Sequence, residues 1–376
     1  MSAAQWARAR AVLAVRLDGM GDLLMSTPAL RALKAGGSGR TLTLLCSPAG
    51  AGVARALPFV DDVIEYRAPW MKHPDDAGAA AHTLALVGTL RERRFDAAVV
   101  LTVFTQSALP AALALLLAGV PLRAAYCREN PYQLLTDWQP EQDLDARTGV
   151  RHEVQRQLDL VAALGASTDD TSLAYPVPLA ARAAAQAWLA RTGVAQERLL
   201  VVHPGATAPS RRYPVDALAD AVAELAEVHG YAVVIAGGAE DCAAARQIHA
   251  RVPQARDLCG ALTLDELAAL IEAAAVLVAN NSLAAHLAAA VGTPVVDLYA
   301  LTNPQHTPWG VRHRVLNHDV ECRFCFKSVC PERHHRCLAA VAPSQVVDAV
   351  CELARDGGRD APADGAARRA SVAVAA

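Results

Sequence analysis

Side chains that could move a proton or bind a phosphate stand directly after short apolar runs. Asp22 closes the turn D-G-M-G-D after one such run, and Ser282 follows another. In a parallel sheet, ligands bind beyond the carboxyl ends of the strands, where the free N–H groups of the next helix attract anions. The two positions therefore predict two features separately, an anion-binding helix start at Ser282 and a carboxylate at a strand end at Asp22.

The stretch around Ser282 predicts a strand, a helix and a second strand. The apolar run 276–279 is typical of a buried strand, and a helix over 283–291 follows it. Asn281 and Ser282 supply capping side chains at the start of that helix. His286 lies one turn further along and could reach an anion held there. The alternative is a capped helix on a sheet, with His286 satisfied in the core.

The turn before Asp22 contains two glycines, which let the backbone approach a ligand closely. A helix over 23–34 follows, so the Asp22 carboxylate lies at its start, where the helix dipole stabilises negative charge. Asp22 is either a base at the mouth of the sheet or an ordinary capping residue. The turn lacks the third glycine of a dinucleotide fingerprint, so no nicotinamide or flavin site is expected.

A second turn at a strand end, H-P-G-A-T-A-P-S-R-R-Y-P, spans residues 203–214. Gly205 and Thr207 offer a close backbone approach and a hydroxyl, and Arg211 and Arg212 add fixed positive charge. This set suits a diphosphate, and a surface turn with two solvated arginines is the alternative.

Two further acidic features are weaker. Glu240, in the turn G-G-A-E-D, could accept hydrogen bonds from ribose hydroxyls or could cap the helix that follows. Asp143 and Asp145 form a D-x-D that resembles a metal motif of sugar-nucleotide enzymes, but their charged, turn-rich surroundings favour a solvated loop.

Length and composition favour a two-domain α/β protein. The chain has 376 residues, of which 53% are hydrophobic and only 5% aromatic, as expected for helices packed on Val-rich strands. A polar, proline-containing linker over 167–178 divides it into residues 1–172 and 173–355, and residues 356–376 have the composition of a disordered tail. The formal charge of −3 argues against nucleic acid as a partner.

Nothing in the sequence predicts export or a membrane span. The longest apolar segment, residues 109–120, is shorter than the roughly 20 residues that cross a bilayer. We expect a cytoplasmic protein, in which the nine cysteines are mostly reduced.

The order of these motifs resembles glycosyltransferase family 9, and in particular the ADP-heptose:lipopolysaccharide heptosyltransferases. The resemblance rests on V-R-L-D-G-M-G-D-L-L-M-S-T-P-A-L, H-P-G-A followed by R-R-Y-P, G-G-A-E-D, D-L-C-G-A-L-T-L-D-E-L and N-S-L-A-A-H-L-A-A-A-V-G-T-P-V-V. It implies a GT-B architecture, with two Rossmann-like domains facing a central cleft. The acceptor would bind the N-terminal domain and the nucleotide sugar the C-terminal one, with no metal required.

The resemblance also implies roles for individual residues. Asp22 matches the proposed general base, Arg211 a lysine that contacts the donor phosphates, and Glu240 a residue near the ribose. Asn281, Ser282 and His286 match a D-S-G-x-x-H pattern at the diphosphate, although Asn281 replaces an aspartate and the following leucine replaces a glycine. The reaction implied is inverting transfer of heptose to a lipid-linked inner-core acceptor, by an enzyme peripheral to the cytoplasmic membrane face.

Four cysteines form a separate cluster, C-x2-C-x4-C-x6-C, at Cys322, Cys325, Cys330 and Cys337. Four thiolates at this spacing could hold zinc tetrahedrally. The paired spacing of a zinc ribbon is absent, and basic neighbours would instead let the segment line the cleft or contact an anionic acceptor. Two other functions remain open: a nucleotide-sugar epimerase or other GT-B enzyme, and a non-enzymatic metal-binding interaction module.

Overall fold

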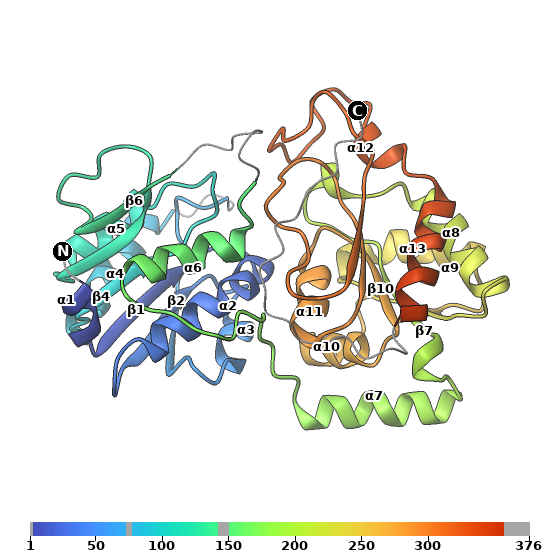
Figure 1. Ribbon diagram of the computed structural model, residues 1–376, viewed down its shortest axis with the longest axis horizontal. Coiled ribbons are helices and arrows are strands. Elements are labelled where there is room, and N and C mark those ends of the chain that lie inside the picture. The colour runs from blue at the N-terminus through green and yellow to red at the C-terminus, as the bar shows by residue number, and fades with distance from the viewer. Residues whose placement is uncertain (1–2, 73–76, 142–149, 357–376) are drawn as a thin grey trace.

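The computed structural model describes residues 3–72, 77–141 and 150–356. Two parallel sheets of six strands each lie side by side, and helices flank both (Figure 1). We call the first sheet and its helices the first lobe, and the second sheet and its helices the second lobe. The α/β class predicted from the sequence is confirmed.

The first sheet has the strand order β3-β2-β1-β4-β5-β6. This is a doubly wound order whose direction reverses between β1 and β4, so a crevice opens beyond the carboxyl ends of these two strands. The elements of the lobe are α1 (Ala3–Arg8), β1 (Ala11–Arg16), α2 (Met20–Ala35), β2 (Thr41–Cys46), α3 (Ala51–Ala56), β3 (Asp62–Glu65), α4 (Ala79–Arg93), β4 (Ala97–Val100), α5 (Leu109–Leu117), β5 (Leu122–Cys127), β6 (Asp137–Pro140) and α6 (Glu153–Ala163).

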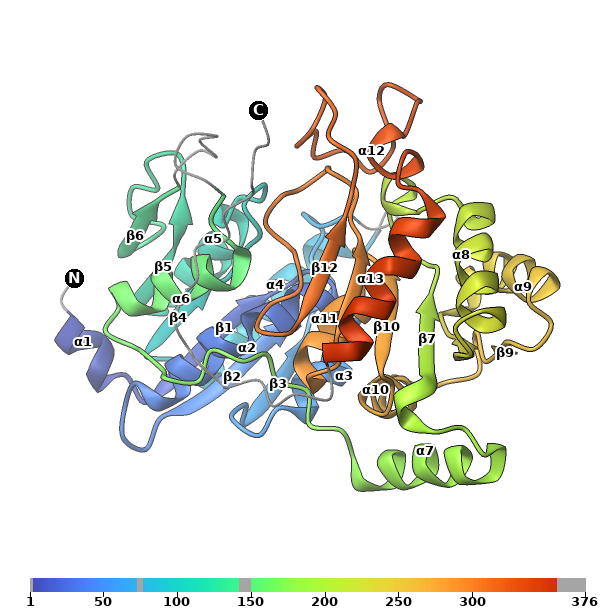
Figure 2. The same ribbon diagram turned by 45° about the vertical axis from the view of Figure 1, so that its right-hand side comes forward.

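The second sheet repeats this arrangement, in the order β12-β11-β10-β7-β8-β9, and reverses between β7 and β10. In Figure 2, α13 crosses one face of this sheet and α11 lies on the other. The elements are α7 (Leu179–Thr192), η1 (Gln196–Arg198), β7 (Leu199–His203), η2 (Pro209–Arg211), α8 (Val215–Glu227), β8 (Ala232–Ile235), η3 (Ala239–Asp241), α9 (Cys242–Arg251), β9 (Arg256–Asp257), α10 (Leu264–Glu272), β10 (Val276–Asn280), α11 (Leu283–Val291), β11 (Val295–Leu298), β12 (His313–Leu316), α12 (Arg336–Ala339) and α13 (Pro343–Asp356).

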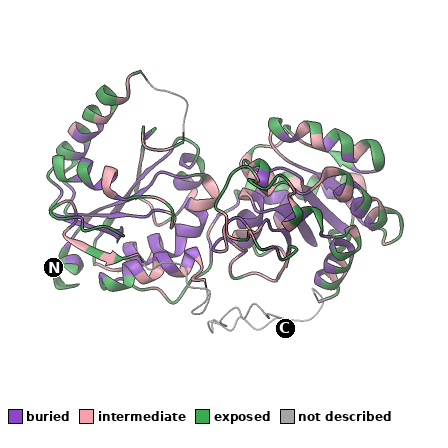
Figure 3. Cartoon of the chain, turned by 90° about the horizontal axis from the view of Figure 1, so that it is seen from above, coloured by how far each residue is buried: buried purple, intermediate pink, exposed green. Residues whose placement is uncertain are grey.

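Successive side chains of the central strands point to opposite faces of the sheet, so each strand packs against the helices on both sides. In β1, Val12 and Ala14 pack in the apolar cluster that contains α2, whereas Leu13 and Val15 pack under α4 and α5. The central strands are buried on both faces, and the exposed surface lies on the outer helices (Figure 3). Because both faces are covered, these strands read as continuous apolar runs.

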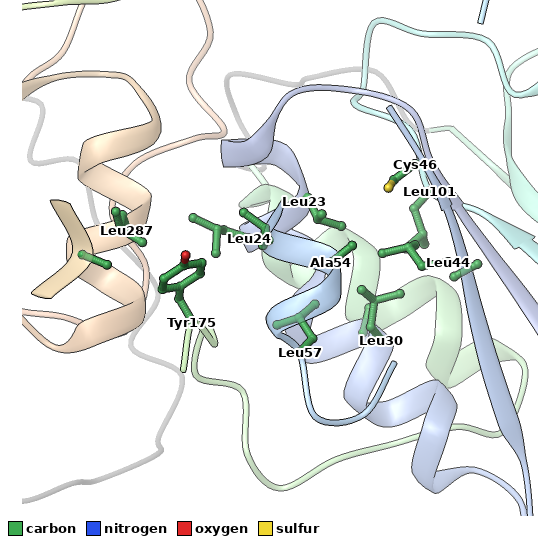
Figure 4. Packing of buried hydrophobic residues seen from close by; sticks show 14 of the residues in the cluster. Leu23, Leu24, Leu30, Leu44, Cys46, Ala54, Leu57, Leu101, Tyr175 and Leu287 are labelled. Atoms are coloured by element: carbon green, nitrogen blue, oxygen red, sulfur yellow. The ribbon is translucent and has the colours of Figure 1, made fainter. Parts of the chain in front are cut away.

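One apolar cluster continues from the first lobe into the second. It includes Leu24 of α2, Leu287 of α11 and Tyr175 of the segment that connects the lobes. Leu24 and Leu287 face each other beside the Tyr175 ring (Figure 4). The Tyr175 hydroxyl also donates to Asp265 Oδ1 at 2.6 Å. Apolar packing therefore holds the first part of α2 against α11.

Most elements lie within a few residues of their predicted bounds, including α11, which spans Leu283–Val291 as expected. Several elements were not predicted, among them α1, whose buried residue is Trp6, and β6, whose polar D-W-Q-P sequence pairs with β5. Edge strands need little apolar sequence, so pattern analysis misses them. No helix of the described residues is both long and apolar enough to cross a bilayer.

Candidate active site

Asp22 lies in the first turn of α2, beyond the carboxyl end of β1. The helix begins at Met20, three residues before the predicted start, and Gly19 is its N-cap. Asp22 is therefore part of the helix and not the residue that caps it. Its carboxylate keeps 26% of its surface exposed, and the backbone N–H of Gly19 contributes to lowering its pKa.

A fully buried arginine lies beneath Asp22. Arg16, the last residue of β1, contacts Asp18 at 3.1 Å, Asp22 at 3.5 Å and Glu153 at 3.4 Å. Burial raises the pKa of Asp22, and the positive charge of Arg16 opposes that effect. Burial likewise raises the pKa of Asp18, to about 6, despite the charge of Arg16. The three carboxyl groups thus share one guanidinium.

On the second lobe, the start of α11 carries buried polar atoms that lack partners. Ser282 is the N-cap, but its side chain makes no capping hydrogen bond. Ser282 Oγ and His286 Nδ1 have no hydrogen-bond partner in the described part of the chain. Burial lowers the pKa of His286 to about 3, so its imidazole is neutral near pH 7. Unsatisfied buried polar groups at a helix start are suited to bind an anion.

The starts of α2 and α11 meet at a glycine. A Cβ added to Gly21 would lie 2.9 Å from His286 Cδ2 and 3.7 Å from the Cα of Leu283. Gly21 thus allows the imidazole of one lobe to rest on the helix of the other. The contact brings the Asp22 region and the Ser282 region, predicted separately from the sequence, into one site.

Arg211 completes the positive side of this site. It lies in η2, and its side chain makes no ion pair or hydrogen bond with the described residues. It is close enough to Asp22 and Asp297 that its charge lowers the pKa of both carboxyl groups. A partly buried guanidinium between two carboxyl groups, without a direct partner, is available to a ligand.

The other residues predicted on this lobe serve mainly to shape the turns. Gly205 is required because an added Cβ would overlap the Asp241 carboxylate at 2.1 Å. Arg212 donates from Nε to the carbonyl oxygen of Ala206 at 2.7 Å, and this hydrogen bond stabilises the loop that contains both residues. Thr207 belongs to the same loop, and its side chain is exposed.

Two further predicted residues differ in burial. Glu240 is exposed in the turn after β8, where it can face a ligand at the cleft edge. Asn281 is buried and donates to the carbonyl oxygen of His306 at 3.4 Å, so it braces the loop after β11.

Sequence reasoning missed several buried groups in the site. Arg16 and Asp18 interrupt an apolar run, and no other feature of the sequence marks them as part of a site. Glu153 gave none, because 137 residues separate it from Arg16 along the chain. Asp297, in β11, is fully buried with neither carboxylate oxygen hydrogen-bonded to a described residue, and burial raises its pKa well above the usual range.

Arg123 of β5 is buried, and its guanidinium donates to backbone carbonyls, including those of Leu134 and Gln133, each at 2.8 Å. Asp143 and Asp145 lie outside the described residues.

The cysteine segment packs against the loop that carries Arg211. The backbone N–H of Ser210 donates to the carbonyl oxygen of Ser328 at 3.0 Å, and His335 Nε2 lies 2.6 Å from the Ser210 carbonyl oxygen. Phe326 also stacks on Phe104 of the first lobe, with ring centroids 6.2 Å apart.

No metal centre is formed by this segment in the structure. Its four cysteines, Cys322, Cys325, Cys330 and Cys337, are free and partly buried. Among the described residues, no group of three or more His, Cys, Asp or Glu side chains is arranged to hold a metal ion. The cysteines are therefore part of a segment that contacts both lobes, and the zinc site suggested by their spacing gains no support.

The profile of glycosyltransferase family 9 (heptosyltransferase) matches residues 83–335, which is more than half of the chain. The chain belongs to glycosyltransferase family 9. It is 27% identical over 349 residues to lipopolysaccharide heptosyltransferase 2 of Escherichia coli (strain K12), which covers 90% of this chain and 96% of that relative.

Solved structures of the family share the fold. A family 9 glycosyl transferase from Veillonella parvula DSM 2008 matches with a TM-score of 0.73 at 21% identity, over 92% of this chain and 98% of that one. The E. coli ADP-heptose lps heptosyltransferase II matches with a TM-score of 0.71 at 24% identity, over 93% and 100%. The predicted family and GT-B architecture are confirmed, and the site lies where the two sheets of this family 9 glycosyltransferase each reverse their strand order.

The contact at Gly21 yields a testable prediction. Gly21→Ala should displace His286 or separate α2 from α11, because the added methyl group enters occupied space. We expect lower thermal stability and weaker nucleotide binding, measured by scanning calorimetry and titration calorimetry. Gly88→Ala is the matched control: Gly88 is also helical, and its added Cβ meets nothing within 4 Å. That variant should gain about 0.5–1 kcal/mol from helix propensity. Equal behaviour of the two variants would contradict the assignment.

Proposed function

We propose that this chain is an inverting, metal-independent transferase that moves heptose, or a closely related sugar, from ADP-heptose to a lipid-linked lipopolysaccharide inner-core acceptor. The observation that carries the proposal is the contact of Gly21, the neighbour of Asp22, with Leu283 and His286 at the α11 start, where Ser282 and His286 have buried atoms without partners among the described residues. One side supplies a carboxylate and the other supplies donors for an anion. The names of the curated relatives support the sugar and the acceptor class.

The leaving diphosphate is assigned to the second lobe. The α11 start, the Ser282 hydroxyl and the neutral His286 imidazole provide hydrogen-bond donors, and Arg211 provides fixed charge. Developing negative charge on the leaving group is stabilised by such preorganised donors. Because Arg211 and a helix dipole supply positive charge, transfer needs no divalent cation in this proposal. Glu240 and Thr207, at the exposed edge, are assigned to the ribose and the outer phosphate.

Asp22 is assigned as the general base. The acceptor hydroxyl gives its proton to the Asp22 carboxylate while its oxygen forms a bond to the anomeric carbon. The bond from that carbon to the diphosphate oxygen breaks on the opposite face, so a single displacement inverts the configuration. The exposed quarter of the carboxylate faces the cleft, which suits this contact.

The acceptor is assigned to a cavity of about 270 Å³ in the first lobe. Asp18 lines it together with Trp70, Thr102, Gln106 and Ser107. An indole, hydroxyls and an amide with little charge suit a neutral sugar ring. We therefore assign residues 1–172 as the acceptor domain and residues 173–355 as the nucleotide-sugar domain.

A membrane-facing surface is assigned to α4 and α5, which pack side by side. Leu84 is 69% exposed, Leu113 47% and Leu117 51%, although α5 carries no charged residue that would favour exposure to water. Exposed Arg91 and Arg94 flank these leucines. Apolar side chains with a basic rim suit an anionic lipid surface. This supports a peripheral location at the cytoplasmic membrane face, where a lipid-linked acceptor is available.

The donor assignment can be tested without an acceptor. ADP and ADP-heptose should raise the melting temperature, with or without EDTA, whereas UDP and GDP should not. Ligand at 100 times its dissociation constant adds about 2.7 kcal/mol of stability. Arg211→Met should lose most of this shift and Arg246→Met, an exposed arginine of the same lobe, should keep it. Stabilisation by UDP or GDP alone, or only without EDTA, would contradict the assignment.

Asp22→Asn tests the base. Because the amide cannot accept the hydroxyl proton, turnover should fall by about 10² to 10⁴ while ADP binding persists. The measurement is the steady-state rate of ADP release with a lipopolysaccharide inner-core acceptor. Wild-type turnover in Asp22→Asn would remove Asp22 from the mechanism.

The lipid surface predicts an effect of polar substitution. Leu113→Ser combined with Leu117→Ser should reduce co-sedimentation with vesicles containing anionic phospholipid, because apolar contact with the bilayer is lost. Leu179→Ser is the matched control, since Leu179 is 81% exposed on the second lobe. Equal vesicle binding by both variants would argue against this surface, and concentration-dependent self-association of the wild type would assign it to a second copy.

A further inference from the structure

The buried charge cluster under Asp22 is larger than a single ion pair. With the described residues, the Arg16 guanidinium makes one hydrogen bond, from Nη1 to Glu153 Oε1 at 3.4 Å. Its Nε and Nη2 atoms contact Asp18 and Asp22 as charges, without aligned hydrogen bonds. The guanidinium is thus anchored on the α6 side and free of directional bonds on the Asp22 side.

Glu153 is itself fixed from several directions. Its Oε1 accepts from Arg156 Nη1 at 3.3 Å and from Gln157 Nε2. Arg156 also pairs with Glu141 and donates to the carbonyl oxygen of Thr102. All of these side chains are almost completely buried, so the cluster cannot relax by moving into water.

We propose that Arg16 is a positioning residue that holds Asp18 and Asp22 as one coupled pair of carboxyl groups, and that this pair sets the pH range of transfer. The inference rests on the proposed role of Asp22 as base. The charge of Arg16 opposes the effect of burial on the pKa of Asp22, and its contact at 3.5 Å fixes the position of the Asp22 carboxylate. Asp18, which lines the acceptor cavity, is the second member of the pair.

The charges that act on Asp22 come from β1, η2 and α6, and the titratable group of α11 beside it, His286 at Gly21, is neutral near pH 7 because burial lowers its pKa to about 3. Arg16 of β1 and Arg211 of η2 lower the pKa of Asp22, and burial and Glu153 of α6 raise it. Asp22 in turn raises the pKa of Asp18, which shows that the two carboxyl groups repel each other. Repulsion between like charges acts on both partners, so the pair titrates in two shared steps.

The sign of each substitution follows from this arrangement. A base works only when ionised, so activity is lost as pH falls through the pKa of Asp22. Loss of the Arg16 charge raises the pKa of Asp22, so the acid limb of the pH–activity profile moves to higher pH. Loss of the Asp18 charge removes a repulsion, lowers the pKa of Asp22 and moves the acid limb to lower pH. A purely structural role for Arg16 predicts neither shift.

The experiment compares Arg16→Met, Arg16→Lys and Asp18→Asn by the pH dependence of kcat/KM for the acceptor, with ADP affinity measured in parallel. Arg16→Met should lose about 10²-fold in turnover through misplacement of the base and move the acid limb upward, with ADP affinity unchanged. Arg16→Lys keeps the positive charge, so the acid limb of its pH–activity profile should stay nearer that of the wild type. Asp18→Asn should move the limb downward.

Arg40→Met is the matched control. Arg40 is also buried in the first lobe, but its guanidinium donates to the backbone carbonyls of Ala9, Leu33 and Trp6 and forms no ion pair with a described residue. Its loss should lower stability and leave the pH profile in place.

Several outcomes would overturn the inference. They are an unmoved pH profile in both Arg16→Met and Asp18→Asn, shifts of these two variants in the same direction, or a shift in Arg40→Met equal to that in Arg16→Met. If Arg16→Met does not fold, the downward shift expected for Asp18→Asn still decides. Loss of turnover in Asp22→Asn together with unmoved limbs would reject the Arg16 inference alone, whereas full turnover in Asp22→Asn would reject the proposed base itself.

Discussion

The packing of α2 on α11 is the constraint on which the site depends. Each helix starts where its own sheet reverses strand order, so each carries free N–H groups to the edge at which ligands bind. Leu24 and Leu287 contribute the apolar contact, and Gly21 leaves room for the His286 ring. A larger residue at position 21 would push against His286 and separate the two helix starts.

The two sides of this contact differ in electrostatic character. On the first lobe, carboxyl groups are held by the buried Arg16, and buried charge is tolerated because each ion has partners. On the second lobe, Ser282 and His286 retain buried atoms without partners. Burial without partners costs free energy, which a bound anion can recover. The asymmetry fits a reaction in which one side removes a proton and the other receives a negatively charged leaving group.

The segment that contains the cysteines contributes to this arrangement through packing. It holds Ser210, the neighbour of Arg211, by backbone and histidine contacts, and it reaches the first lobe through Phe326. The backbone at Phe324, Phe326, Arg333 and His335 lies in the left-handed region, which is uncommon for residues other than glycine. Such a conformation persists only where surrounding contacts fix it, and here those contacts connect both lobes to the Arg211 loop.

The sequence by itself determined the elements and the local ligand-binding features. Strand ends at Asp22 and Ser282, the helix over Leu283–Val291 and the capping box at Thr263 depend on neighbours within a few residues, and sequence patterns report such neighbours well. The tertiary structure alone decided which buried charges meet. Glu153 reaches Arg16 across 137 residues, and the buried Arg123 guanidinium donates to carbonyls of its own lobe, including that of Leu134. Long charged side chains choose partners by distance in space, which local pattern does not encode.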